Sequence, residues 1–226
     1  MSTFLWSGHR RPASVVAAAF AVGLVTALSA CSSGSGSSGG GVFHIDDAPK
    51  SSGVRGTALD QAIAKPATDL TDTAGKPYNL KTATAGKLAF VYFGYTHCPD
   101  VCPTIMADLG ATLSKLTPAQ QAKTSVVFVT TDPARDTGTV MRTWLSNFNA
   151  SFVGLTGTWN QINGLATTLG VPLEKPATTS KGQYTVDHGA QLTAFDPDGL
   201  ARDVYFPGTP VTDYIHDVPL LMRNVQ

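Results

Sequence analysis

Apolar positions along the chain alternate between two patterns. Continuous runs of β-forming residues at Leu88–Tyr95 and Ser125–Thr131 have the length and composition of strands buried on both faces. Between them, Thr104–Leu116 places Ile105, Leu109, Leu113 and Leu116 at the three- and four-residue spacing of a helix with one buried face. Strands that alternate with helices predict a parallel or mixed sheet covered by helices.

The remaining segments extend this alternation on both sides. They predict an N-terminal hairpin around Leu70 and Tyr78 with its turn at Thr73–Lys76, and a C-terminal hairpin formed by Gln191–Asp196 and Ala201–Phe206. Between the hairpins they predict a helix at Val140–Phe148, a strand at Val153–Leu155 and a helix at Trp159–Leu169. A last helix is expected to have Thr209 as its cap and Pro210 as its first residue, and Pro219 is expected to kink or end it. Asp136 or Thr137 is expected to cap the helix at Val140–Phe148. This order predicts the α/β class and a thioredoxin-like fold: a central mixed sheet flanked by helices, with a C-terminal β-hairpin plus helix.

The first 30 residues have the layout of a secretory signal. His9, Arg10 and Arg11 precede an apolar segment, Ala13–Leu28, which is followed by small residues. The apolar segment is nearly long enough to act as an uncleaved membrane anchor, and this is the alternative interpretation. The sequence Leu28–Cys31 resembles a bacterial lipobox, whose cysteine is acylated, so residues 1–30 are interpreted as a lipoprotein signal peptide and Cys31 as the lipid attachment site.

Composition predicts one domain on a flexible tether. Ser32–Gly41 contains only serine and glycine, so residues 31–57 are interpreted as the lipidated cysteine and its tether, and residues 58–226 as the globular domain. The chain has 16 basic and 16 acidic residues, and removal of the signal would take two arginines and no acids. Without a basic cluster, nucleic-acid binding is excluded. Because either a lipoprotein signal or an uncleaved anchor would place it there, the domain is expected on the outer face of the cytoplasmic membrane, held by the lipid on Cys31.

Cys98 and Cys102 are the cysteines that remain once Cys31 carries lipid. They lie between the strand at Leu88–Tyr95 and the next helix, which Pro103 is suited to begin, so the helix is expected to start near Cys102. Unpaired N–H groups and the dipole at a helix N-terminus stabilise thiolate. The pair is interpreted as reactive, and the alternatives are a small structural disulfide or two buried thiols.

The four-residue spacing lets both sulfurs face one ion or oxidise to a disulfide. A dithiol favours soft metals, above all Cu(I), whereas zinc normally takes four ligands. His188 is the candidate third ligand, because the predicted fold brings the loop before the last hairpin near the cysteines. A lone histidine is more often structural or exposed, which is the alternative.

Several motifs together resemble the Sco/SenC family. They are Phe93–Pro103 (FGYTHCPDVCP), Thr131–Thr137 (TDPARDT), Val153–Thr158 (VGLTGT) and Tyr184–His188 (YTVDH). The resemblance covers roughly Ala67 to the C-terminus. It implies a membrane-tethered, thioredoxin-like copper protein that serves assembly of the dinuclear copper centre in cytochrome c oxidase subunit II.

The resemblance also implies residue roles. The copper ligands of the family correspond to Cys98, Cys102 and His188, and the acid that lies close to the metal corresponds to Asp187, for which plain solvation of the loop is the alternative. His97 is not a family ligand. Gly189-Ala190 departs from the residues that many members have after the histidine, and the extra flexibility is expected to let His188 move.

Two functions follow from this reading. The first is a copper chaperone without turnover that carries Cu(I) on Cys98, Cys102 and His188 to the oxidase, with Cu(II) as a second state of the cargo. The second is a thiol-disulfide oxidoreductase that reduces the cysteines of subunit II before they receive metal. A peroxidase of the same fold is a distant third, and the copper donor and thiol reductant are not identified by any motif.

Overall fold

The computed structural model describes residues 53–176 and 184–223 of the chain. The signal peptide expected at residues 1–30, the lipid site expected at Cys31 and the Gly/Ser run lie outside the described residues. Within the described ranges, no helix is both long enough and apolar enough to cross a membrane.

A mixed sheet of eight strands forms the centre of the domain, in the order β1-β8-β7-β4-β5-β6-β2-β3. The pairs β4–β5 and β5–β6 are parallel, and the other pairs are antiparallel. The bounds of the strands are β1 Thr57–Ala64, β2 Asp69–Asp72, β3 Pro77–Asn79, β4 Leu88–Gly94, β5 Thr124–Thr130, β6 Val153–Thr156, β7 Leu192–Phe195 and β8 Leu200–Tyr205.

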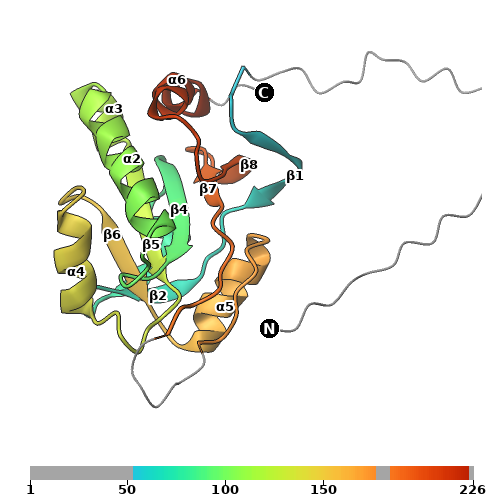
Figure 1. The fold of residues 1–226 in the computed structure, drawn as a ribbon. Helices are drawn as coiled ribbons and strands as arrows, with labels where there is room; N and C mark the ends of the chain where they lie inside the picture. Colours follow the sequence, from blue (N-terminus) through green and yellow to red (C-terminus); the bar gives the residue numbers. More distant parts are fainter. Residues whose placement is uncertain (1–52, 177–183, 224–226) are drawn as a thin grey trace, which may run out of the picture. The chain divides into compact units, whose positions relative to one another are not determined.

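Helices cover both faces of this sheet (Figure 1). Their bounds are α1 Leu80–Ala83, α2 Val101–Lys115, α3 Pro118–Ala122, α4 Gly138–Ser146, α5 Trp159–Thr168 and α6 Val211–Leu221. Every residue of β4 is buried, and alternate side chains enter opposite layers. Phe90 and Tyr92 pack with α2, α4 and α6, whereas Val91 and Phe93 pack with α5.

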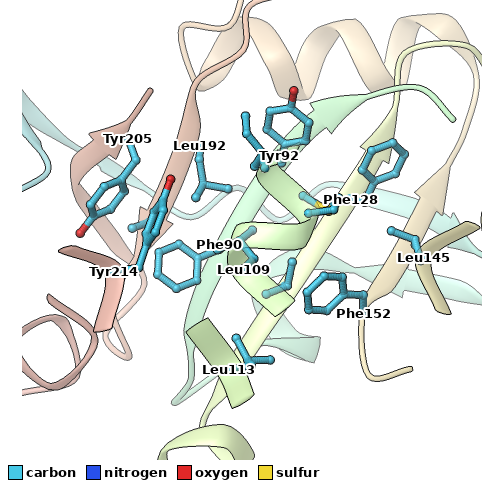
Figure 2. Packing of buried hydrophobic residues seen from close by; sticks show 14 of the residues in the cluster. Phe90, Tyr92, Leu109, Leu113, Phe128, Leu145, Phe152, Leu192, Tyr205 and Tyr214 are labelled. Carbon is cyan, nitrogen blue, oxygen red and sulfur yellow. The ribbon is translucent and has the colours of Figure 1, made fainter. Parts of the chain in front are cut away.

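Figure 2 shows the first of these layers from close by. Phe90 and Tyr92 of β4 and Phe128 of β5 share this layer with Leu109 of α2, and Tyr205 and Tyr214 continue it. Aromatic side chains that meet edge to face contribute more than their buried area alone. The ring centroids of Phe90 and Tyr214 are 6.2 Å apart at 89°. This layer holds α2, and therefore the cysteines, against the central strands.

The predicted thioredoxin-like α/β fold is confirmed, with differences at individual elements. β1, α1 and α3 were not predicted. β1 is an edge strand with mostly exposed residues, so it has no apolar alternation. α3 is a five-residue helix that begins with Pro118 after the capping box of Thr117 and Gln120, and it has no buried residue.

The C-terminal helix differs from the prediction at both ends. Its N-cap is Pro210 instead of Thr209, and the helix continues through Pro219 to Leu221. A proline removes one intrahelical hydrogen bond, but Pro219 lies in the last turn, where only two more residues follow it in the helix. The prediction that Pro219 could end α6 was therefore wrong, because the helix continues to Leu221.

Asp217 of α6 joins this helix to the segment that enters β1. Its side chain is fully buried and accepts hydrogen bonds from the backbone N–H groups of Arg55 (2.8 Å) and Gly56 (3.1 Å) and from the hydroxyl of Tyr205 (2.8 Å). One carboxylate thus holds together α6, β8 and the start of the described chain.

We predict that Asp217→Ala lowers the free energy of unfolding by about 3 kcal/mol, because three donors, among them the buried hydroxyl of Tyr205, lose their buried acceptor. Urea denaturation followed by circular dichroism measures the change. The control is Asp213→Ala on the same helix, which removes a partly exposed ion pair with Arg55 and is expected to cost less than about 1 kcal/mol. Equal losses in the two variants would contradict a central role for Asp217.

Candidate metal centre

The close approach of α2 to the end of β4 places Cys102. β4 ends at Gly94, and a Cβ atom at this position would lie 2.9 Å from Sγ of Cys102 and 2.8 Å from the ring of Tyr92. Glycine therefore leaves the space that the sulfur occupies. Cys102 is fully buried there.

The first turn of α2 also positions Cys98. The helix begins at Val101, close to the expected start, and Pro103 is its third residue, where a backbone N–H would have no intrahelical partner. The N–H of Cys102 donates to Sγ of Cys98 at 3.4 Å. Cys98 is partly exposed, and both cysteines are free thiols. The sulfur of Cys98 therefore accepts a hydrogen bond from one of the unpaired N–H groups at the N-terminus of α2.

His188 lies beside the two thiols, as predicted. Its Nε2 atom is 3.6 Å from Sγ of Cys102, and its Nδ1 atom is 3.0 Å from the carbonyl oxygen of Gly189. Because a carbonyl only accepts, Nδ1 carries the proton and Nε2 keeps its lone pair toward the sulfur. One ligand atom from each of Cys98, Cys102 and His188 lies within 4.8 Å of the other two. The cluster could hold one metal ion.

The segment after His188 is fixed by close packing. The N–H of Gly189 donates to the carbonyl of Pro172 at 2.7 Å, and a Cβ atom on Gly189 would lie 2.7 Å from the ring of Pro172. His188 also forms an isolated antiparallel bridge with Leu173. The expectation that Gly189 adds flexibility was therefore wrong, because this glycine permits a tight contact that a larger residue would disrupt.

Burial sets the protonation of the site. It raises the pKa of Cys102 to about 12, and the neighbouring thiol of Cys98 adds to this effect. The expectation that the helix N-terminus favours thiolate is therefore wrong for Cys102. Burial also lowers the pKa of His188, so its imidazole is neutral at pH 7 and available as a ligand.

Asp187 and His97 lie beside the cluster without joining it. The side chain of Asp187 is exposed, and its charge raises the pKa of His188 less than burial lowers it. The imidazole proton goes to Gly189, so Asp187 does not orient the ring through a hydrogen bond at Nδ1. Nδ1 of the exposed His97 lies 3.1 Å from the hydroxyl of Thr96.

Sequence analysis missed two further contacts at the site. The hydroxyl of Tyr92 donates to Sγ of Cys102 at 3.6 Å. The sequence pattern gave no signal for this contact, because Tyr92 lies within a continuous buried strand. Asp136 is not a helix cap, since Thr137 caps α4. Asp136 instead accepts from the N–H (3.0 Å) and hydroxyl (2.6 Å) of Thr96, which fixes the loop before Cys98. Its place in the motif Thr131–Thr137 was the available signal.

The fold and the cluster define a thioredoxin-like domain in which two thiols and one imidazole lie close enough together to hold a soft metal ion. The SCO1/SenC family model matches residues 57–223. The chain belongs to the SCO1/SenC family.

Individual relatives agree with this assignment. The chain is 38% identical to mitochondrial SCO2 of Saccharomyces cerevisiae over 139 residues, which cover 60% of this chain and 45% of that protein. It resembles apo Sco1 of Thermus thermophilus with a TM-score of 0.67 and 31% identity, over 75% of this chain and 97% of that one. It also resembles copper-bound ScoI of Bradyrhizobium japonicum with a TM-score of 0.63 and 30% identity, over 70% and 99%. The chain spans less than half of the yeast protein.

We predict that iodoacetamide modifies Cys98 before Cys102 in the reduced, metal-free protein at pH 7–8. Cys98 is partly exposed, whereas burial keeps Cys102 protonated, and thiolate is the reactive form. Peptide mapping by mass spectrometry at successive times measures both rates, and urea-unfolded protein is the control, in which the rates should converge. Equal rates in the folded protein would contradict the asymmetry described here.

Proposed function

We propose that the chain is a copper-binding protein that carries Cu(I) on Cys98, Cys102 and His188. The observation that carries this proposal is the convergence of their ligand atoms within 4.8 Å. Two thiolates and one imidazole suit Cu(I), which accepts three soft or borderline ligands. The copper-bound state of the ScoI relative supports the choice of metal.

The environment of each ligand suits a metal that is taken up and released. Cys98 and His188 are partly exposed, and Cys102 is buried. An incoming protein thiolate can therefore reach the ion from the side of Cys98 and His188, while Cys102 holds it from within. Exchange of one ligand at a time passes the ion on without a free intermediate.

Membership of the SCO1/SenC family supports a role in assembly of cytochrome c oxidase, and we propose subunit II, with its dinuclear copper centre, as the recipient. The cysteine pair of such a recipient supplies the thiolates that this exchange requires. We propose that this exchange takes place outside the cytoplasmic membrane. The lipobox-like sequence at Leu28–Cys31 supports the same location through a lipid on Cys31.

We predict that the reduced protein binds one Cu(I) per chain and that His188→Ala weakens this binding. Loss of one of three ligands should lower the affinity by at least about tenfold, because substitution even of outer-shell groups costs metal sites this much. Anaerobic competition with a Cu(I) chelator measures the affinity. His97→Ala is the matched control, since His97 lies next to Cys98 in the sequence but outside the cluster. Unchanged affinity in His188→Ala would exclude the three-ligand site.

A thiol-disulfide oxidoreductase is the second candidate function. The hydrogen bond from the helix N-terminus to the partly exposed sulfur of Cys98 favours it, because this geometry suits a nucleophilic thiolate. The reduction potential of the pair, measured against glutathione in the same variants, separates the two functions. A reductase needs a strongly reducing pair and works without His188, whereas a copper carrier needs His188 whatever the potential.

We predict that Cys31→Ser prevents processing of the precursor in a bacterial host. A lipoprotein is cleaved only after its cysteine is acylated, so the variant should keep its first 30 residues and gain no lipid. Mass spectrometry of the membrane fraction measures both properties, and globomycin treatment of the wild type should reproduce the defect. If both treatments left processing unchanged, Cys31 would not be the attachment site.

A further inference from the structure

The segment Tyr184–His188 presents alternate side chains to the domain. Tyr184 and His188 are partly buried and Val186 is buried, whereas Thr185 and Asp187 are exposed. This is the two-residue period of extended chain, in which every second side chain points to the same face. The position of Tyr184 therefore determines which face His188 presents to the cysteines.

Two side chains, those of Asp132 and Arg135, hold Tyr184 in place, and we call these three residues the Arg135 clamp. The guanidinium of Arg135 lies over the ring of Tyr184, 3.6 Å from its centroid. The hydroxyl of Tyr184 donates to Asp132 at 2.7 Å, and Nε of Arg135 pairs with the other carboxylate oxygen of Asp132. Asp132 is fully buried, and Arg135 is mostly buried, which strengthens both the ion pair and the stacking.

The clamp is anchored to the end of β5 and to the end of β4, the strand that precedes the cysteines. The N–H of Thr131 donates to the carbonyl of Gly94 at 2.7 Å, and the N–H of Asp132 donates to the hydroxyl of Thr130 at 2.9 Å. Gly94 is the last residue of β4 and Thr130 the last residue of β5. The clamp therefore connects the rigid end of the sheet to the segment that carries His188.

Tyr95 makes a second contact between the clamp and His188. The guanidinium of Arg135 lies 5.7 Å from the centroid of the Tyr95 ring, and the rings of Tyr95 and His188 meet edge to face at 5.8 Å and 89°. Arg135 thus contacts Tyr184, four residues before His188, and also the ring that packs against His188 itself. None of the three clamp residues belongs to the Cys98, Cys102 and His188 cluster.

We propose that Arg135 is a positioning residue that holds Nε2 of His188 over Cys102, so that the third ligand is in place before a metal ion arrives. Preorganisation of this kind lowers the cost of ordering a ligand on binding. Without the guanidinium, Asp132 keeps a buried charge with one partner fewer, and Tyr184 loses the group against which its ring is stacked. The His188 segment then moves away from the cysteines. The metal-binding part of this proposal rests on the proposed function.

The first test is a double-mutant cycle with Arg135→Gln and His188→Ala, measured by anaerobic Cu(I) competition. If Arg135 acts through His188, Arg135→Gln lowers the affinity about 10- to 100-fold in the wild type, as for groups that orient metal ligands, and adds no further loss to His188→Ala. An equal loss in both backgrounds, or no loss in either, would overturn the proposal. Arg142→Gln is the matched control: Arg142 also bridges segments, donating to Thr73 at 2.7 Å and to the carbonyl of Phe152 at 3.1 Å, and its loss should leave the affinity unchanged.

The second test needs no copper. Nε2 of His188 lies 3.6 Å from the sulfur of Cys102, so movement of the His188 segment should uncover that sulfur. Iodoacetamide should therefore modify Cys102 several-fold faster in metal-free Arg135→Gln than in the wild type, and about as fast as in His188→Ala. A rate equal to that of the wild type would overturn the positioning role even if copper binding is confirmed. If Cys102 is modified faster in Arg135→Gln but the wild type binds no Cu(I), the positioning role is supported and only the proposed function fails.

Graded variants keep the proposal testable if Arg135→Gln does not fold. Tyr184→Phe keeps the stacked ring and loses only the hydrogen bond to Asp132, whereas Tyr184→Leu loses both. The Cys102 modification rate should rise in the order wild type, Tyr184→Phe, Tyr184→Leu. Arg135→Lys keeps the charge but not the planar stacking group, so it should fall between the wild type and Arg135→Gln. A Tyr184→Leu protein with wild-type rates would overturn the proposal.

Discussion

The site depends on the contact between the first turn of α2 and the last residue of β4. At Gly94 the strand has no side chain, and the sulfur of Cys102 occupies the space that a Cβ atom would need. The aromatic layer between α2 and the central strands holds the helix at this distance. Three neighbouring groups are placed around this one buried residue. Sγ of Cys98 accepts from its backbone N–H, the hydroxyl of Tyr92 donates to its sulfur, and Nε2 of His188 lies 3.6 Å from that sulfur.

Burial of Cys102 makes the two thiols chemically different. With a pKa of about 12, Cys102 stays protonated at pH 7, and removing its proton there costs about 7 kcal/mol at 1.36 kcal/mol for each pH unit. An ion must form a strong bond to sulfur to offset this cost, which favours a thiophilic metal over a hard one. A neutral His188 adds no positive charge to the site, so a cation meets no repulsion from the imidazole.

Much of this arrangement could be predicted from the sequence, because its signals are local. The continuous apolar run of β4, the helical spacing of α2 and the two cysteines between them are sufficient to place a dithiol at a strand-to-helix junction. The direction of the thiol pKa was not predictable in the same way. A helix N-terminus lowers a thiol pKa and burial raises it. Only the folded structure shows that Cys102 is fully buried while the helix N–H donates to Cys98. Gly189 was misjudged for a related reason, since its close contact is with Pro172, which is distant in the sequence.

The contacts that hold His188 show why a three-residue motif is not a complete site. Cys98 and Cys102 are placed by a rigid strand and helix, whereas His188 belongs to an extended segment with one isolated bridge. Such a segment needs side-chain contacts to fix its register, and alternation alone makes a one-residue shift turn the imidazole away from the sulfurs. Contacts on both sides of His188 prevent such a shift: Tyr184 is held by Asp132 and Arg135 on one side, and Gly189 is packed on Pro172 on the other. The acids and the arginine of the loop after β5 therefore support the site, although none of them is among its ligands.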